Sequence, residues 1–377
     1  MTPIFISADN IISPVGDNTA DNFNGLLRDV SGVNLHTGSP FSAQPFYASL
    51  FNPGHFSYQT GKQQYTRFEN LLIASIGDAL ANSAVKAADT KTVLIISTTK
   101  GNISLLETET ASAELNRRIS LNTSARLLAS HFGFVNTPII VSNACISGIL
   151  AILTGMRLIR SGQYDHAVIA GADVITRFVL SGFQSFQAVS AAPCKPFDAA
   201  RDGINLGEGA ATMIISSRKE YSYGAMVMGG ATSNDANHIS GPSRAGEELN
   251  MAIGRSLQEA GLLAAGVDFI SAHGTATLYN DEMEAKAINL AGLQTVPVNS
   301  LKGYYGHTLG AAGLIESVIA VKSLKENTVI PTRGFSSMGV TQPVNVCTGV
   351  YKNELRNCLK TASGFGGCNA AMIFGKE

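Results

Sequence analysis

One cysteine and two histidines stand in small-residue segments where this sequence can present reactive groups. Cys145 lies in the segment Asn143–Gly148, between a short apolar run and a long helical pattern. His273 and His307 each stand in a glycine-containing segment of the second half of the chain. A thiol is a nucleophile and an imidazole can accept or donate a proton, so the three side chains together would suit covalent catalysis.

The position of Cys145 predicts a reactive thiol. The run Pro138–Val141 is typical of a buried strand, and apolar residues recur at helical spacing from Ile149 to Ile159. At such a strand-to-helix junction, free N–H groups and the positive end of the helix dipole favour the thiolate. A free cysteine is more often a small apolar filler of the core, so the assignment depends on the distant histidines.

Both histidines occupy positions where function concentrates. His273 directly follows the strand pattern Val267–Ala272, and acidic residues begin the next helical pattern. His307 lies in Leu301–Gly313, where small residues allow close approach of a ligand. Ordinary surface or core positions are expected for four other histidines: His36, His55, His131 and His166.

Several other site types are not expected. Residues 303–313 match neither the P-loop nor the dinucleotide-binding spacing. The two histidines do not share a helical face and no H-E-x-x-H string occurs, so no metal site is predicted. The five cysteines are scattered without a C-x-x-C pair, which predicts neither zinc binding nor disulfides: Cys145, Cys194, Cys347, Cys358 and Cys368.

The composition predicts a glycine-rich α/β protein. The 377 residues include 38 glycines, and 45% are hydrophobic while 15% are charged. A net charge of −1 gives no reason to expect a nucleic-acid partner. No apolar run is long enough to cross a membrane, and the N-terminus lacks the features of a secretion signal. A cytoplasmic location is therefore expected.

Strand and helix patterns alternate along most of the chain. Strand patterns cover residues 1–9, 92–97, 138–141, 167–172, 210–215, 225–231, 267–272 and 296–299. Helical patterns cover residues 68–85, 149–159, 246–260, 282–293 and 309–324, with two or three more helices expected within 100–136 and only loops and short elements within 10–61. This alternation predicts mostly parallel sheets covered by helices. In each half of the chain, a turn of small residues precedes a long helix, which suggests a duplication. The first half, residues 1–217, would carry the cysteine, and the second half, residues 218–377, would carry the two histidines.

Five ordered motifs resemble the β-ketoacyl-acyl-carrier-protein synthases of the elongating type, in the thiolase superfamily. The motifs are Asn143-Ala144-Cys145; Lys195-Pro196-Phe197-Asp198 with Arg201-Asp202-Gly203 and Gly207-Glu208-Gly209-Ala210; Ala272-His273-Gly274-Thr275; Lys302 with Gly306-His307 and Gly310-Ala311-Ala312-Gly313; and Gly364-Phe365-Gly366-Gly367. They extend from about residue 140 to the C-terminus, whereas the first hundred residues match only in general plan. The resemblance implies a thiolase-like α/β fold with two pseudo-duplicated halves in α/β/α/β/α layers.

The resemblance also implies an activity and partners. The expected reaction is a decarboxylative Claisen condensation of an acyl group, held on Cys145, with malonyl-acyl carrier protein, as in fatty acid, aryl polyene or polyketide synthesis. No cofactor is expected on the enzyme, because substrates travel on the phosphopantetheine of acyl carrier protein. A homodimer is expected, or a heterodimer with a related subunit. The alternatives are a chain-length-factor-like partner, which the intact Cys145 and histidines disfavour, a thiolase-type enzyme using coenzyme A esters, and an unrelated cysteine hydrolase.

The same resemblance suggests a role for each site residue. His273 and His307 would be the donor pair for the enolate, with Lys302 in an orienting role and Glu316 as its buried partner. The N–H groups of Cys145 and Phe365 would form the oxyanion hole, and Phe365 would also gate the acyl pocket. The expected substrate-binding residues are Thr275, Thr277, Gly366 and Gly367.

Some residues depart from the family pattern. Ile146 follows the nucleophile, Cys368 replaces the usual threonine, and two tyrosines, Tyr304 and Tyr305, precede His307. These departures suggest an aromatic, unsaturated or otherwise unusual acyl chain. Two basic residues, Lys195 and Arg201, are expected to contact an acidic carrier protein.

Overall fold

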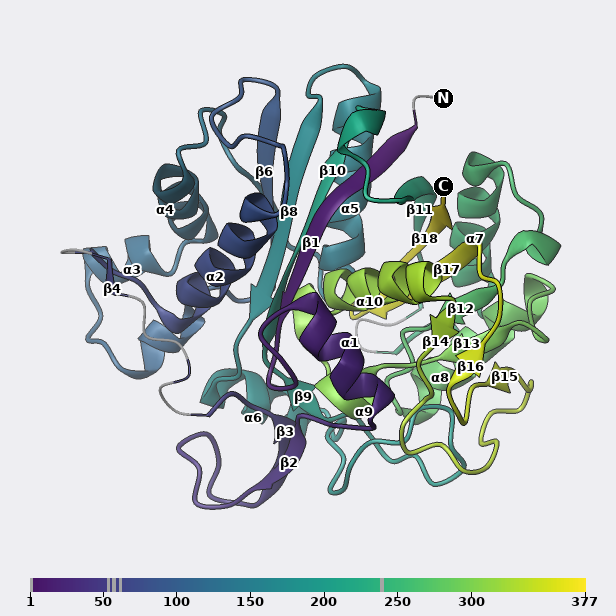
Figure 1. The fold of residues 1–377 in the computed structure, drawn as a ribbon. Helices are drawn as coiled ribbons and strands as arrows, with labels where there is room; N and C mark the ends of the chain where they lie inside the picture. The colour runs from purple at the N-terminus through teal and green to yellow at the C-terminus, as the bar shows by residue number, and fades with distance from the viewer. Residues whose placement is uncertain (1–2, 53–54, 56–58, 61–62, 238–240) are drawn as a thin grey trace.

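The computed structural model describes residues 3–52, 55, 59–60, 63–237 and 241–377 (Figure 1). Its centre is an 11-stranded sheet in the order β15-β13-β12-β17-β18-β11-β1-β10-β8-β6-β7. The strands of this sheet are β1 (Ile4–Ile12), β6 (Thr92–Ser97), β7 (Ile139–Val141), β8 (His166–Asp173), β10 (Gly209–Ser216), β11 (Ala225–Asn234), β12 (Phe269–Ser271), β13 (Pro297–Asn299), β15 (Asn345–Val346), β17 (Asn357–Gly364) and β18 (Cys368–Lys376). Smaller sheets are formed by β2 (Val33–His36), β3 (Phe46–Ser49) and β9 (Leu206–Gly207), by β4 (Gln59–Thr60) and β5 (Gln63–Gln64), and by β14 (Thr328–Val329) and β16 (Tyr351–Lys352).

The two halves of the large sheet repeat one topology. From β1 the neighbours are β10, β8, β6 and β7, and the pairings run antiparallel, antiparallel, parallel and parallel. From β11 the neighbours are β18, β17, β12 and β13, with the same sequence of pairings. Among the described residues, two pairs join β1 to β11. We propose that the halves divide at 217/218, as the sequence suggested.

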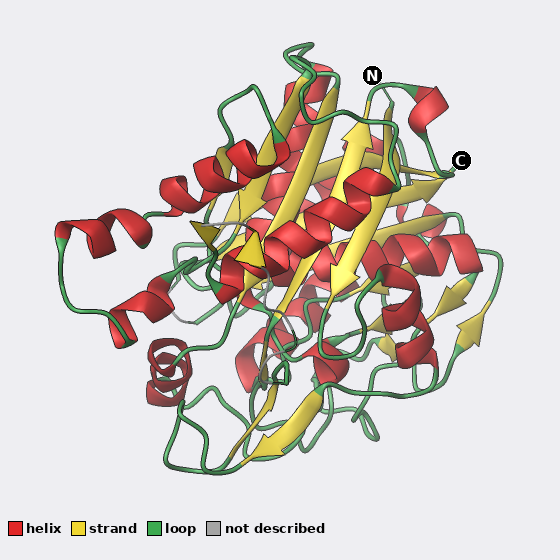
Figure 2. Cartoon of the chain, turned by 60° about the vertical axis from the view of Figure 1, so that its left-hand side comes forward, coloured by secondary structure: helices red, strands yellow, loops and turns green. Residues whose placement is uncertain are grey.

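Helices cover both outer faces and fill the space between the halves (Figures 1 and 2). The α-helices are α1 (Thr19–Leu27), α2 (Arg67–Ala81), α3 (Ala113–Arg118), α4 (Leu121–Phe132), α5 (Ser147–Arg160), α6 (Arg177–Ser185), α7 (Glu247–Ala260), α8 (Leu278–Leu290), α9 (Lys302–Tyr305) and α10 (Ala312–Glu326). Short 3-10 helices are η1 (Ile103–Glu107), η2 (Lys219–Tyr221), η3 (Ala264–Gly266) and η4 (Leu309–Ala311). α2 packs on β1, β8 and β10, whereas α7 packs on β11 and β18 and contacts α8.

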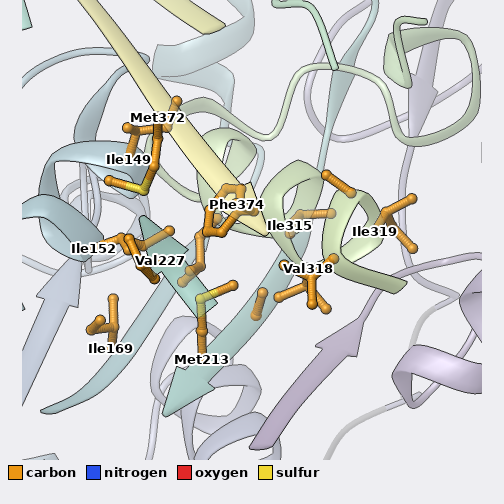
Figure 3. Close-up of a cluster of buried hydrophobic side chains, with 14 of the residues drawn as sticks. Ile149, Ile152, Ile169, Met213, Val227, Ile315, Val318, Ile319, Met372 and Phe374 are labelled. Carbon is orange, nitrogen blue, oxygen red and sulfur yellow. The ribbon is translucent and has the colours of Figure 1, made fainter. Parts of the chain in front are cut away.

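The middle layer consists of α5 and α10, which contact each other and strands of both halves. Figure 3 shows Ile149 and Ile152 of α5 and Ile315 and Val318 of α10 within one apolar cluster with strand residues such as Phe374. Burial of such side chains is the main favourable term in folding. The layers are therefore α/β/α/β/α, and the predicted thiolase-like architecture is confirmed.

Most sequence predictions of elements are correct, with shifts at their ends. The strand at 92–97 has the predicted bounds, and 100–136 contains η1, α3 and α4. The helix predicted for 68–85 stops at Ala81, and the one predicted from residue 282 begins earlier, at Leu278. Part of the segment 10–61 lies outside the described residues, but it also contains α1, where the Asn18 side chain accepts from the Asp21 N–H at 2.9 Å. Among the described helices, none is long and apolar enough to cross a membrane.

Candidate active site

Cys145 lies in a tight turn between β7 and α5. The turn places Ala144 at a φ of 44°, in the left-handed region that residues with a side chain rarely adopt. Ser147, the first residue of α5, stabilises this turn because its Oγ accepts from the Asn143 N–H at 2.8 Å and donates to the Ala144 carbonyl at 2.7 Å. Strained backbone of this kind is typical of functional sites. The sequence therefore presents the thiol at the end of a strand, directly before a helix.

Close packing of α5 against α10 brings the cysteine to the histidines. A Cβ atom built on Gly148 would lie 2.4 Å from the backbone nitrogen of Leu314, so this helix contact requires glycine. α10 follows the loop that carries His307. The contact between the helices thus joins the Cys145 turn of one half to the His307 loop of the other.

The three predicted reactive side chains meet at one point. The Cys145 Sγ and the His307 Nε2 are 2.9 Å apart. The rings of His273 and His307 meet edge to face, with centroids 5.3 Å apart and an interplanar angle of 82°. Sγ and one ring nitrogen from each histidine all lie within 4.8 Å of one another. A substrate carbonyl bound to the thiol would therefore be within reach of both imidazoles.

The acidic start of α8 fixes the loop that carries His273. Glu284 accepts from the backbone N–H groups of His273 at 2.8 Å and Gly274 at 2.7 Å. Asp281 accepts from the Thr275 N–H at 2.9 Å, and burial raises the pKa of its carboxyl group to about 6. The sequence shows these acidic residues at the start of the helical pattern but does not indicate their role. Its carboxylates anchor the loop backbone, which leaves the histidine side chain free for chemistry.

Burial determines the protonation of the three groups. It raises the pKa of the Cys145 thiol to about 12, so the expected thiolate is not the resting form. Desolvation of the anion is the largest cause of this shift, and Ile146 separates the cysteine from Ser147, the first residue of α5. Burial, followed by the positive charge of Lys302, lowers the pKa of His273 and of His307 well below the usual range. Both imidazoles are therefore neutral, and His307 can accept the thiol proton.

Lys302 and Glu316 contact each other in the interior beneath the histidines, as a charge pair between Nζ and Oε1. The sequence suggested this pair. A second partner of Glu316, Lys360 of β17, was not predicted from the sequence. Its Nζ lies 2.8 Å from Oε2 of Glu316 and its side chain is also fully buried. The available signal was a lysine within the otherwise apolar and small run Cys358–Ala362, directly before the glycine-rich loop. Two ammonium groups thus flank one carboxylate.

A cavity of about 430 Å³ leads from the surface to Cys145, His273 and His307. Its lining also includes Thr275, Thr277 and Gly367. Three aromatic rings complete this wall: Phe183, Phe186 and Phe365. The hydroxyl oxygens of Thr275 and Thr277 are 2.9 Å apart. Gly366, which was also expected to bind substrate, does not line the cavity but forms the adjacent turn at a φ of 88°.

Phe365 stands at the aromatic wall of this cavity. Its ring stacks on Phe183 with centroids 5.8 Å apart and meets Phe186 edge to face at 5.5 Å. Before it, Gly364 passes close to the nucleophile, because a Cβ there would lie 3.0 Å from the Cys145 nitrogen. The glycine-rich loop thus brings the backbone around Phe365 beside the Cys145 N–H, as an oxyanion hole between the two would require.

Other sequence expectations differ from the structure. Arg201 is buried and donates to the carbonyl groups of Asp198 at 2.9 Å and Gly339 at 2.6 Å, so it cannot serve as an exposed contact for a carrier. The residues whose identities suggested an unusual acyl chain are buried and do not line the cavity: Ile146, Tyr304, Tyr305 and Cys368. These four residues therefore give no support, at this cavity, for an aromatic or unsaturated acyl chain.

Comparisons with known proteins identify the family. Residues 1–220 match the N-terminal domain model of β-ketoacyl synthases, and residues 223–336 match the C-terminal domain model. The chain is 28% identical to 3-oxoacyl-[acyl-carrier-protein] synthase 2 of Vibrio cholerae over 98% of both chains. It is 32% identical to the protein of the same name from Mycobacterium leprae, over 64% of this chain and 60% of that one.

Solved structures agree with this assignment. The ishigamide ketosynthase/chain length factor superposes with a TM-score of 0.91 at 26% identity, covering 100% of this chain and 99% of that one. A chain from the complex of the ketosynthase ApeO with its chain length factor ApeC, from Xenorhabdus doucetiae, gives a TM-score of 0.87 at 25% identity, with coverage of 100% of this chain and 98% of that one. The fold, the meeting of Cys145 with two histidines and both domain matches lead to one conclusion: the chain belongs to the β-ketoacyl synthase family.

Proposed function

We propose that the protein joins an acyl group, held as a thioester on Cys145, to a malonyl unit on acyl carrier protein, with loss of carbon dioxide. The observation that carries the proposal is the 2.9 Å contact between the Cys145 Sγ and the His307 Nε2, with the His273 ring beside it. Names of the relatives, which are 3-oxoacyl-[acyl-carrier-protein] synthases, support the same class of reaction.

In the first half-reaction, Sγ of Cys145 attacks the thioester carbonyl of an acylated carrier. The thiol proton passes to Nε2 of His307, which is neutral and can accept it. Collapse of the tetrahedral intermediate breaks the carbon–sulfur bond to the carrier, and the leaving thiolate takes up the proton. The products are acyl-Cys145 and the free carrier thiol.

In the second half-reaction, the carbon–carbon bond of the malonyl group to its carboxylate breaks and carbon dioxide leaves. The electron pair becomes an enolate, whose oxygen needs donors already in place. His273 and His307 can provide these, since no described residue pairs with either Nδ1 and neither ring is locked in one tautomer. The enolate carbon then attacks the acyl carbonyl, the carbon–sulfur bond to Cys145 breaks, and the departing thiolate takes up one proton from solvent to restore the thiol.

The oxyanion formed at Cys145 in either half-reaction needs its own donors. We assign this role to the N–H groups of Cys145 and Phe365, since Gly364 lets the two backbone segments approach closely. Lys302 is assigned the role of orienting the histidine pair electrostatically, held by Glu316. Thr275 and Thr277 would bind the phosphopantetheine arm within the cavity, with Gly367 beside them and Gly366 shaping the turn.

The proposed partners are acyl carrier protein and a second subunit. Substrates would arrive on the carrier's phosphopantetheine, with no cofactor bound by the enzyme itself. Both solved relatives described above are named with a chain length factor, which makes a related subunit a candidate beside a second copy of this chain. Cys145 and both histidines are present, so this chain would be the catalytic subunit. The cytoplasmic location stays a prediction.

Intact-protein mass spectrometry tests the proposal. Wild type and Cys145→Ala would be incubated with a panel of acyl carrier thioesters and then with malonyl carrier protein. We expect an acyl adduct only on the wild type, followed by its discharge into a β-ketoacyl carrier product. Absence of an adduct with every donor, alone and with a candidate partner subunit, would contradict a catalytic role. An adduct that forms from coenzyme A esters and is never elongated would favour the thiolase-type alternative.

A further inference from the structure

Lys360 is a buried cation to which the reaction described above assigns no role. It lies in the middle of β17 and its side chain is fully buried. Its Nζ donates to three carbonyl oxygens: those of Thr361 at 2.8 Å, Ser271 at 3.0 Å and Ala272 at 3.1 Å. An ammonium group has three donors, so all are used. These carbonyl groups, together with the Glu316 carboxylate 2.8 Å away, explain how the charge can be accommodated inside the protein.

Two of those carbonyl groups belong to the residues directly before His273. The parallel register of β12 and β17 pairs Ser271 with Lys360, and the ammonium therefore sits across the end of β12. On the other side of the turn, Glu284 accepts from the N–H groups of His273 and Gly274. The backbone around His273 is thus held by a cation at the carbonyl groups of Ser271 and Ala272 and by a carboxylate at the N–H groups of His273 and Gly274.

The same ammonium belongs to a buried charge cluster. Glu316 contacts Lys360 through Oε2 and Lys302 through Oε1. Glu284 accepts from the Thr361 hydroxyl at 2.6 Å, which places a second carboxylate beside β17. The described titratable groups that surround the histidine pair or line its cavity are Cys145 of the turn before α5, Asp173 of β8, Asp202 between α6 and β9, Asp235 after β11, Tyr279, Asp281 and Glu284 of α8, Lys302 of α9, Glu316 of α10 and Lys360 of β17.

We propose that Lys360 is a positioning residue for the histidine pair: its ammonium holds the end of β12 that carries His273, and with Lys302 it brackets Glu316. A second cation therefore lies beside the two imidazoles. The kinetic consequences rest on the proposed condensation, whereas the effect on the imidazoles requires no substrate.

The direction of the electrostatic effect follows from the charge. After burial, the positive charges of Lys302 and Lys360 are among the causes that lower the pKa of both His273 and His307. Removal of one cation raises the pKa of each imidazole, since the imidazolium is then less strongly repelled. More His307 is protonated at a given acidic pH and cannot accept the thiol proton. The acid limb of the acylation rate therefore moves to higher pH.

Lys360→Met tests the proposal, because methionine removes the charge and all three donors but keeps an unbranched side chain. Lys352→Met, on the exposed strand β16, is the matched control. Lys360→Arg retains the charge. For each variant, the imidazole titrations would be followed by nuclear magnetic resonance, and acylation of Cys145 and decarboxylation of malonyl carrier protein would be measured separately against pH.

We expect Lys360→Met to acylate Cys145 within about twofold of wild type at alkaline pH. Its acid limb should shift upward by about half a pH unit or more, and its decarboxylation rate should fall by about tenfold at every pH because His273 is less well placed. Lys360→Arg should keep the acid limb of the wild type. The control should match the wild type throughout. A uniform loss of both half-reactions, with unshifted histidine titrations, would indicate a merely structural role and overturn the proposal.

Two further outcomes separate this proposal from the proposed function. If the wild type condenses and Lys360→Met has unchanged titrations with both rates within about twofold, the role of Lys360 is overturned while the function stands. If the wild type does not condense any substrate, the titrations alone decide: an upward shift supports the electrostatic role, and no shift overturns it. Should Lys360→Met fail to fold, Lys360→Gln, which also lacks the charge, takes its place under the same criteria.

Discussion

The Sγ atom of Cys145 lies 2.9 Å from Nε2 of His307, although the two residues are 162 positions apart in the chain. The contact joins a turn of the first half to a loop of the second. It supplies a proton acceptor for a thiol whose pKa burial raises to about 12. Nucleophile activation in this protein therefore depends on the packing of its two halves.

Separate roles for the two histidines predict separate kinetic defects. His307→Ala should slow acylation of Cys145 by about 10²-fold or more, because the proton acceptor is lost. His273→Ala should leave acylation within a few fold of wild type but slow decarboxylation by about 10²-fold, because one enolate donor is lost. Single-turnover acylation and carbon dioxide release would be measured. Equal acylation defects in both variants would contradict the assignment.

Reactivity of Cys145 should depend on pH in different ways with and without His307. In His307→Ala the thiol ionises alone, and with a pKa of about 12 its thiolate fraction rises about tenfold per pH unit across the neutral range. In the wild type, a neutral His307 can accept the thiol proton. The rate of alkylation should therefore rise much less steeply with pH once the pH is above the lowered pKa of this imidazole. Iodoacetamide labelling rates of Cys145 would show this. A flat profile in His307→Ala would contradict it.

Gly364 should be required for catalysis rather than for folding. In Gly364→Ala the new Cβ would lie 3.0 Å from the Cys145 nitrogen and 3.0 Å from the Cys368 Sγ, so the loop must move away from the nucleophile. We expect acylation to fall by about 10²-fold, as when an oxyanion donor is misplaced, with little loss of stability. Gly254→Ala in α7, where a Cβ meets nothing within 4 Å, is the control and should keep full activity.

Glu316 should be essential for stability because it separates two buried ammonium groups. Glu316→Gln would leave Lys302 and Lys360 without that anion, and we expect a loss of about 3–5 kcal/mol in the free energy of unfolding. The control in the same helix is Glu326→Gln. Glu326 pairs with Lys322 at 2.6 Å on the surface, and its loss should cost less than about 1 kcal/mol. Chemical denaturation would compare the two variants.

Asp198 should make a pH-dependent contribution to the free energy of unfolding. Burial raises the pKa of its carboxyl group, but hydrogen bonds from the backbone N–H groups of Ser337, Ala200 and Ser336 and from the Ser336 hydroxyl outweigh this and lower it from 3.8 to about 2. The folded pKa is depressed, so the stabilisation is complete above about pH 4 and disappears as pH falls through 2. It amounts to about 2 kcal/mol.

The variant Asp198→Asn tests this contribution. It should be less stable than wild type by about 2 kcal/mol at neutral pH, with the difference shrinking as the medium is acidified. Urea unfolding at a series of pH values would measure both quantities. A difference that stays constant down to pH 2 would show that the carboxylate charge is not the cause.

Local sequence pattern by itself determined the reactive residue types and most secondary structure. The apolar spacing along α5 and the run at 92–97 predicted those elements closely, because side-chain periodicity is a local property. The ordered motifs around Cys145, His273 and His307 predicted the family before any contact was known. The end of α2 was less predictable, since capping and packing decide where a pattern stops.

Tertiary structure decided the ionisation and the partners of those residues. Whether Cys145 is a thiolate depends on burial and on His307 from the other half of the chain, and neither is encoded near residue 145. Arg201 appeared to be a surface charge, yet backbone carbonyl groups surround it, and Lys360 acquired a role only when β17 was paired with β12. Desolvation and charge pairing depend on neighbours brought together by folding, so the sequence supplies the groups and the fold sets their chemistry.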